Sequence, residues 1–272
     1  MSVPEHLSCL VKCATSLSTS DGHPIEVWEL KVDLLDPHLS NWASTFRQQY
    51  CADTDIDILA AGTGLSRAEY LTNLVFPDEQ SAPGPSIRAG DFAELLVADY
   101  VEHLLGFWVP RAKYAEKAVR NESVKGVDIL GFRLVTEASA SANDVLLTFE
   151  AKAQLSDGAY VDRLQVAIND SSRDSIRRAE SLNATKRRLR SMGDFGSAQT
   201  VERFQNPTDH PYVYRSGAAA VLSDSVFNEG LLTSNTRVAQ HKNASNLLLI
   251  VIRGNELMKL AHLLYRKAAD EA

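Results

Sequence analysis

Two residues of opposite charge interrupt an apolar, strand-like run near the middle of the chain. The run is Val-Leu-Leu-Thr-Phe-Glu-Ala-Lys at residues 145–152, and a first apolar run at residues 124–132 contains Asp128. Because side chains alternate along a strand, Glu150 and Lys152 point to the same face. Burying these charges is costly unless other groups pair with them. Asp128 can reach that face if the two runs form a β-hairpin, and a divalent cation would satisfy both carboxylates.

A third acid comes from a predicted helix upstream of the hairpin. Residues 87–105 carry an apolar stripe, and Ser86 is the predicted N-cap. Glu94 precedes Val97 by three residues, so it lies on that stripe and points toward the core. A salt-bridged edge residue is the competing interpretation of Glu94. The other acids of the segment are predicted to lie nearer the opposite side: Asp91, Asp99 and Glu102.

This set of residue types suits the cleavage of a phosphodiester bond. Asp128 and Glu150 would hold Mg²⁺ or Mn²⁺ through oxygen ligands, and Glu94 would bind the metal or orient its water. The cation would polarise the phosphate and lower the pKa of a bound water. Lys152 would position that water and offset the charge that grows on the phosphate. The candidate catalytic residues are therefore Glu94, Asp128, Glu150 and Lys152, and the first three are the candidate metal ligands.

A dense basic segment follows the hairpin, at residues 173–190, and is predicted to be helical. Arg173, Arg177 and Arg188 fall on one helical stripe. Such a stripe can bind the phosphates of nucleic acid, but a solvated helix face or a docking surface for a partner is equally consistent with it. The candidate nucleic-acid-binding residues are Arg173, Arg177, Arg178 and Arg188.

The composition is that of an ordinary soluble protein. The chain has 272 residues, a formal net charge of −7 and three cysteines, which form no disulfide framework. The acidic balance argues against a protein that coats nucleic acid, although a local basic patch remains compatible with an enzyme that acts on it. No apolar run is long enough to span a membrane and no leader is evident, so a cytoplasmic protein is expected. No Gly-Lys-Ser/Thr motif follows a glycine-rich loop, so we expect no nucleotide-driven motor in this chain.

The remaining pattern predicts an α/β fold. The N-terminal part is expected to contain a hairpin from residues 7–15 and 25–31, a helix over 40–50, and a helix whose capping box is Ser66 to Glu69. The Pro-Gly-rich stretch before Ser86 predicts a boundary between a smaller N-terminal α+β domain, residues 1–85, and a second domain, residues 86–272. After the basic segment, residues 193–211 are expected to be a loop. Two buried strands and a closing helix capped by Asn255 are predicted at residues 218–222, 247–252 and 256–268.

The ordered set of helix Glu94, strand Asp128 and strand Glu150-x-Lys152 resembles the PD-(D/E)xK signature of restriction-endonuclease-like nucleases. Val127 stands where that signature has proline, a position at which many members also depart from it. The resemblance implies a mixed central sheet flanked by helices, with the active site at a forked edge of the sheet.

Three segments give a narrower resemblance. Residues 90–96, 126–132 and 149–152 are similar to the HamA family, the nuclease effectors of Hachiman anti-phage systems, and to its AbpA-like relatives. The similarity covers about residue 86 to the C-terminus. It implies a Mg²⁺- or Mn²⁺-dependent enzyme that degrades DNA and is held in check by, and works with, a HamB-like helicase subunit. The missing nucleotide-binding motif agrees with this, because the motor would reside in the partner.

Four other classes of protein fit the sequence less well. A non-catalytic adaptor or interaction subunit with the same fold is the main alternative, in which Asp128, Glu150 and Lys152 form a structural ion-pair cluster. A kinase-like enzyme lacks its glycine-rich loop and His-Arg-Asp segment, and a serine hydrolase lacks its Gly-x-Ser-x-Gly elbow. The seven histidines do not cluster at metal-ligand spacing, which argues against a zinc hydrolase.

Overall fold

A mixed β-sheet runs through the protein, which a computed structural model describes over residues 3–115 and 117–272. The seven-stranded sheet has the order β1-β3-β7-β6-β5-β4, and the short strand β2 pairs with β3. The four central strands β3, β7, β6 and β5 are parallel. At the two edges, β1 pairs with β3 and β4 pairs with β5, both in antiparallel orientation. The strands are β1 Leu10–Lys12, β2 Leu17–Ser18, β3 Pro24–Leu30, β4 Ile129–Arg133, β5 Val145–Gln154, β6 Val213–Ser223 and β7 Leu247–Gly254.

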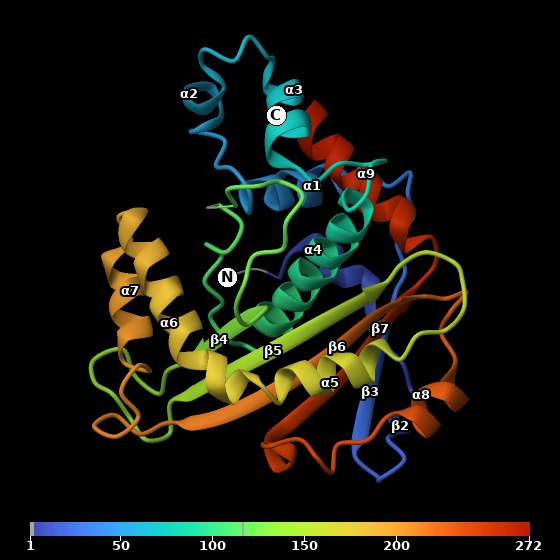
Figure 1. Cartoon of the computed structure of the whole chain (residues 1–272), viewed down its shortest axis with the longest axis vertical. Coiled ribbons are helices and arrows are strands. Elements are labelled where there is room, and N and C mark those ends of the chain that lie inside the picture. The colour runs from blue at the N-terminus through green and yellow to red at the C-terminus, as the bar shows by residue number, and fades with distance from the viewer. Residues whose placement is uncertain (1–2, 116) are drawn as a thin grey trace.

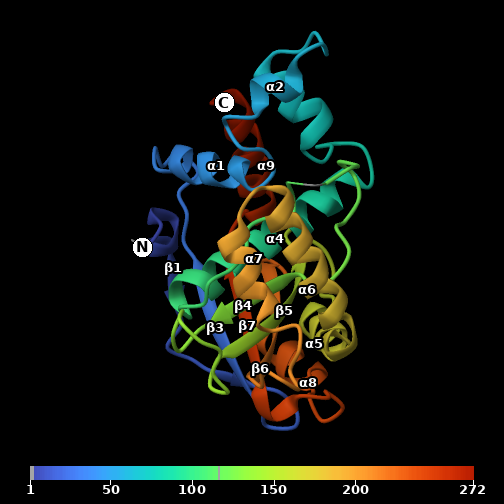
Figure 2. The same ribbon diagram turned by 90° about the vertical axis from the view of Figure 1, so that its left-hand side faces the viewer.

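Helices cover both faces of this sheet (Figures 1 and 2). On one face, Phe149 and Ala151 of β5 pack in a hydrophobic cluster with helices α1, α4 and α9. On the other face, Ala218 and Ala220 of β6 pack with α5 and α8. Near β4, Phe132 packs with α6 and α7. The helices are α1 Leu39–Gln48, α4 Gly84–Asp99, α5 Arg163–Ser171, α6 Asp174–Ser191, α7 Phe195–Glu202, α8 Glu229–Asn235 and α9 Leu257–Asp270.

Shorter helical segments complete the chain. Two π-helical turns extend neighbouring helices, and two 3-10 turns precede strands β1 and β7. The capping box at Ser66 and Glu69 is confirmed: the Ser66 hydroxyl accepts from the Glu69 amide, and the Glu69 carboxylate accepts from the Ser66 amide. These segments are the 3-10 turns Glu5–Cys9 and Ala244–Asn246, the helices α2 Ile56–Ala60 and α3 Arg67–Tyr70, and the π turns Leu71–Val75 and Tyr100–Leu104.

The sheet and the core continue across the predicted domain boundary at residue 85. Strand β3 pairs in parallel with β7, so strands from residues 24–30 and 247–254 lie side by side. Helix α1 packs against α9, and the same hydrophobic cluster contains both Leu10 and Leu264. The α/β class with a mixed central sheet is confirmed. The division into residues 1–85 and 86–272 stays a prediction, and we describe the chain as a single sheet with its covering helices.

Several local predictions were wrong. Residues 5–9 form a 3-10 turn, so the first strand is only Leu10–Lys12. Helix α4 begins at Gly84, two residues before the predicted cap. Asn255 does not cap α9; Glu256 is the cap residue, with a left-handed φ of 51°. The predicted loop at residues 193–211 contains α7, which begins after Asp194 accepts a hydrogen bond from the Ser197 amide.

Two predictions about the whole chain can be compared with the structure. Cys9, Cys13 and Cys51 are free, as expected. In the part of the chain that the structure describes, no helix is both long enough and apolar enough to cross a membrane.

Candidate active site

Asp128 and Glu150 meet at the point where β4 begins. The antiparallel register pairs Ile129 with Phe149, which places Asp128 one step earlier and opposite Glu150. The Asp128 Oδ2 accepts from the Ala151 amide at 3.1 Å, and the Glu150 Oε1 accepts from the Asp128 amide at 3.4 Å. The predicted hairpin therefore brings these two carboxylates together. Its pairing is local, which is why alternation along the strand was enough to predict it.

Lys152 and Arg177 surround Glu150 with positive charge. The Lys152 ammonium lies 3.3 Å from Glu150 Oε2, 3.8 Å from Asp128 Oδ2 and 3.1 Å from Asp170 Oδ2. The Arg177 Nη2 lies 3.3 Å from Glu150 Oε1. Lys152 stands where the sequence predicts it, whereas Asp170, at the end of α5, was not predicted. Glu150 itself is only 1% exposed, so its partners come almost entirely from protein groups.

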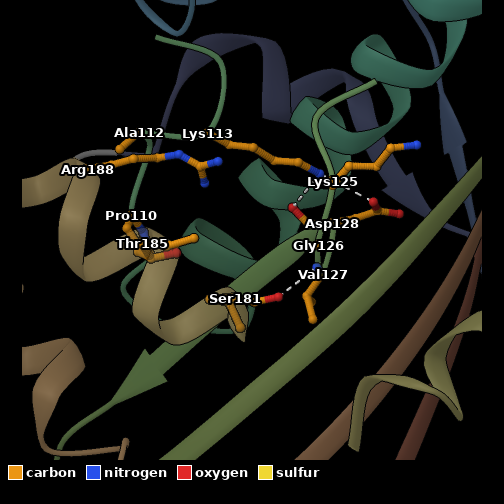
Figure 3. Close-up of a pocket in the computed structure, with 12 residues that line it drawn as sticks. Pro110, Ala112, Lys113, Lys125, Gly126, Val127, Asp128, Ser181, Thr185 and Arg188 are labelled. Atoms are coloured by element: carbon orange, nitrogen blue, oxygen red, sulfur yellow. Dashed lines mark hydrogen bonds and ion pairs between the residues drawn. The ribbon is translucent and has the colours of Figure 1, made fainter. Parts of the chain in front are cut away.

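Glu94 approaches from the other side of the sheet. Helix α4 packs on the face of β5 that carries Phe149 and Ala151, whereas Glu150 contacts α6 on the opposite face. Glu94 is linked to Asp128 through Lys113: the ammonium lies 2.5 Å from Glu94 Oε2 and 3.3 Å from Asp128 Oδ1. Figure 3 shows Lys113 reaching across to Asp128 from its own segment. The Tyr114 hydroxyl also donates to Glu94 Oε2, at 2.6 Å.

A second buried acid, Asp174, belongs to this cluster and was not predicted. It is the first residue of α6, its side chain is 0% exposed, and its Oδ1 accepts from Arg177 at 2.7 Å. Its Oδ2 is buried with no hydrogen-bond partner among the described residues. Buried carboxylate oxygens are normally satisfied, and the neighbouring Glu150 carboxyl group, when protonated, is a donor for Asp174. The only sequence signal was an acid at the start of the basic segment.

Crowding of acids shifts their protonation. Burial, with the charges of Asp128 and Asp174, raises the pKa of Glu150 to about 9. Burial and the Asp128 charge raise the pKa of Glu94 to about 7, and burial raises that of Asp174 to about 7. Burial opposes ionisation of Asp128 as well, but Lys113, Lys152 and the Ala151 amide hold its pKa below the ordinary value. Asp128 is therefore an acid of this cluster whose ionised form the neighbouring cations favour.

The same carboxylates raise the pKa of two lysine ammonium groups, those of Lys113 and Lys152. Burial disfavours the charge of Lys113, yet the adjacent Glu94 and Asp128 carboxylates hold its pKa above the ordinary value. Lys152 behaves alike, with Asp128 and Glu150 as the opposing carboxylates. Both lysines are therefore cations at neutral pH and compensate the acids around them.

The four candidate arginines, of which Arg173 precedes α6 and the others lie within it, have different contacts. Arg177 is ion-paired with Glu150 and Asp174 inside the acid cluster. Arg173 is 71% exposed and pairs with Asp170, at 3.2 Å. Arg178 stacks over the Tyr214 ring at 4.4 Å. Arg188 lines a small pocket beside Asp128 (Figure 3). The stripe is thus divided between the acid cluster, the solvent and a pocket, and its contact with nucleic acid stays a prediction.

The residues suit a hard cation in chemistry but do not converge on one point. Carboxylate oxygens such as those of Asp128 and Glu150 are the ligands that Mg²⁺ and Mn²⁺ prefer. Over residues 3–115 and 117–272, however, no group of three His, Cys, Asp or Glu side chains is placed to hold a metal ion. The Lys113 ammonium separates Glu94 from Asp128. Metal ligation by all three acids therefore requires Lys113 to move.

Comparison with known proteins gave a match at the level of family. A family model described as HamA matches residues 4–268, which is nearly the whole chain. The searches of curated proteins and of solved structures each gave no match. The family match extends well beyond the three segments from which the sequence similarity was first noted, and includes strands β1 and β3.

Proposed function

The chain belongs to the HamA family and so to the Hachiman defence systems, and we propose that it is their metal-dependent DNA nuclease. The observation that carries this proposal is the placement of Asp128 opposite Glu150, with Lys152 two residues further along the same strand. Two adjacent carboxylates and a neighbouring ammonium can supply metal ligands and positive charge for the hydrolysis of a phosphodiester. The raised pKa values of Glu94, Glu150 and Asp174 support it, because strongly perturbed pKa values cluster at functional sites.

Each residue has a task in this reaction. Asp128 and Glu150 would hold Mg²⁺ or Mn²⁺, and Glu94 would complete the oxygen ligands. A bound metal would polarise the phosphate and lower the pKa of a water molecule. The Lys152 ammonium is a quarter exposed, so a phosphate oxygen can approach it while it stays beside both acids. It would offset the negative charge that develops on the phosphate during cleavage. Arg177 would keep Glu150 in place through its 3.3 Å contact.

A helicase subunit is the proposed partner. The chain lacks a nucleotide-binding loop of the P-loop type, so it has no means of its own to separate strands. A HamB-like helicase would supply that activity and deliver DNA to the acid cluster. The present chain has a formal charge of −7, so its own non-specific affinity for DNA should be weak. This agrees with a partner that supplies most of the affinity for DNA.

Cleavage of DNA by purified protein tests the proposal. Linear and circular DNA would be incubated with the chain in Mg²⁺ or Mn²⁺, with and without the helicase subunit. Glu150→Gln and Lys152→Met should each lower the cleavage rate by at least about 100-fold while the protein stays folded. Lys186→Met is the matched control, because Lys186 lies on α6 with only a 3.9 Å contact to Glu202. Undiminished cleavage in both site variants would refute the nuclease proposal.

A non-catalytic adaptor is the second candidate. One observation favours it: Glu94, Asp128 and Glu150 all pair with lysine or arginine side chains, as in a structural ion-pair network. The combined replacement Asp128→Leu, Glu150→Met and Lys152→Met distinguishes the two. An adaptor with this network made apolar would still assemble with its partner and protect cells from phage. A nuclease would assemble but lose protection.

A further inference from the structure

Lys113 lies in a segment that has no helix or strand of its own. Residues 109–115 and 117–128 carry only turns and bends between α4 and β4. The segment is nevertheless held tightly, because Lys113 is only 14% exposed and Lys117 only 4%. Its side chains anchor it: Ala112 and Tyr114 are buried in the hydrophobic core. Arg111, Lys113 and Lys117 form ion pairs with acids of α4. The backbone of the segment can therefore stay in place while the Lys113 side chain changes its rotamer.

Lys113 and Lys117 form separate ion pairs with the acids of this region. Lys113 bridges Glu94 and Asp128, and it also donates to the Asp128 carbonyl oxygen at 3.3 Å. Lys117 lies 2.7 Å from Asp91, one helical turn before Glu94. Asp91 also accepts from the Tyr50 hydroxyl at 2.8 Å, so its position does not depend on Lys117 alone. The second attachment can therefore persist when the first is broken.

We propose that Lys113 is an internal cation that closes the acid cluster, and that a divalent metal ion must displace it to bind between Glu94 and Asp128. This inference rests on the proposed metal-dependent function. Its basis is that the ammonium already contacts the carboxylate oxygens that a metal would need, Glu94 Oε2 and Asp128 Oδ1. Two cations cannot share those oxygens at such distances without strong repulsion.

The consequence is a resting state of the nuclease. With Lys113 in place the acids are neutralised and do not converge on a metal, as the described residues show. When Lys113 leaves, Glu94 and Asp128 become available to a metal. Arg111, Tyr114 and Lys117 keep the segment on α4 while the Lys113 ammonium is away from the acids, so that closure is reversible. A partner or a DNA strand that attracts the Lys113 ammonium would open the site in the same way.

Binding of Mn²⁺ to the full-length protein tests this inference without measuring activity. Isothermal titration would compare wild type with Lys113→Met, which keeps the length of the side chain and removes its charge. We expect Lys113→Met to bind Mn²⁺ at least about tenfold more tightly, because no ammonium then bridges the Glu94 and Asp128 carboxylates. Lys117→Met is the matched control: it loosens the same segment but leaves Lys113 on the acids, so its affinity should stay within about twofold of wild type.

A second measurement uses the wild-type chain alone. If Mn²⁺ displaces Lys113, trypsin should cut faster after Lys113 or Arg111 in saturating Mn²⁺ than in Mg²⁺-free and Mn²⁺-free buffer. This keeps the inference testable should Lys113→Met fail to fold. Unchanged cleavage in saturating Mn²⁺ contradicts the inference.

The outcomes separate this inference from the proposed function. Mn²⁺ binding to Lys113→Met that is no tighter than to wild type, with binding abolished by Asp128→Asn, shows that Lys113 positions the acids without excluding metal. That result overturns the inference and leaves the nuclease proposal standing. If wild type and Lys113→Met both fail to bind Mn²⁺ and both fail to cut DNA, the metal-dependent function is refuted and the inference falls with it.

Discussion

Replacing Glu150 with glutamine should stabilise the metal-free protein, and only at neutral and alkaline pH. Glu150 is 1% exposed and its pKa is raised from an ordinary 4.5 to about 9, chiefly by burial. Between these two values the folded protein binds a proton at this position that the unfolded chain releases. Stability contributed by the protonated group is therefore lost as the pH rises from about 4.5 to 9. Glutamine has the shape of the protonated carboxyl group and never ionises.

The expected gain in the free energy of unfolding depends on how far the pH lies above the ordinary pKa of the carboxyl group. Each pH unit costs the folded state up to about 1.4 kcal/mol, so three units between pH 5 and pH 8 set a ceiling of about 4 kcal/mol. Lys152 and Arg177, each 3.3 Å from a Glu150 oxygen, recover part of the cost when the group ionises. We expect Glu150→Gln to match wild type at pH 5 and to be more stable by about 2–4 kcal/mol at pH 8, a shift in Tm of roughly 5–10 °C.

Thermal unfolding in EDTA at pH 5, 6, 7 and 8 measures this. Glu137→Gln is the control, because Glu137 is exposed in the loop between β4 and β5 and its replacement should leave the pH profile unchanged. A Glu150→Gln curve parallel to that of wild type at every pH would refute the reasoning. It would mean that Glu150 is ionised throughout the interval and that its neighbouring cations outweigh burial.

Three further substitutions have defined outcomes in the same unfolding assays. Arg177→Ala should lower the free energy of unfolding by about 2–3 kcal/mol, because it leaves the buried Asp174 without its guanidinium partner. An effect below about 0.5 kcal/mol would mean that Asp174 is protonated. Gly217→Ala should lower the free energy of unfolding by about 2–3 kcal/mol, because a β-carbon there would lie 2.2 Å from the Phe149 ring. A variant as stable as wild type would show that the ring can move aside. Ser66→Ala should cost about 1 kcal/mol through the lost capping box, and hydrogen exchange should rise in α3 but not in the sheet.

The sequence was informative where contacts are local. Asp128 and Glu150 belong to adjacent strands of one hairpin, so alternation along each strand predicted their meeting. The capping box at Ser66 and the helix that became α6 follow from residue spacing in the same way. The HamA resemblance, noted from three short segments, is confirmed by a match to residues 4–268.

Contacts between distant segments were not predictable by these means. Lys113 lies in a stretch without periodicity, and its meeting with Glu94 depends on how that stretch folds back over α4. Asp91 was placed on the side of the helix away from the core. Helix α4 contacts both β5 and α9, so more than one side of it is buried, and Asp91 faces Lys117 and Tyr50 in the interior. A single apolar stripe is a poor guide for a helix that is enclosed in this way.

The pairing of β3 with β7 has a consequence for synthesis of the protein on the ribosome. All the elements that carry the acid cluster, from α4 to α6, have been translated by residue 191, but β7 and α9 come last. Until then β3 has no parallel neighbour, β6 presents an unpaired edge, and the face of α4 that α9 will cover is bare. Incomplete chains should therefore aggregate through that edge rather than assemble the acid cluster. Under the proposed function, such unfinished copies would not cut DNA.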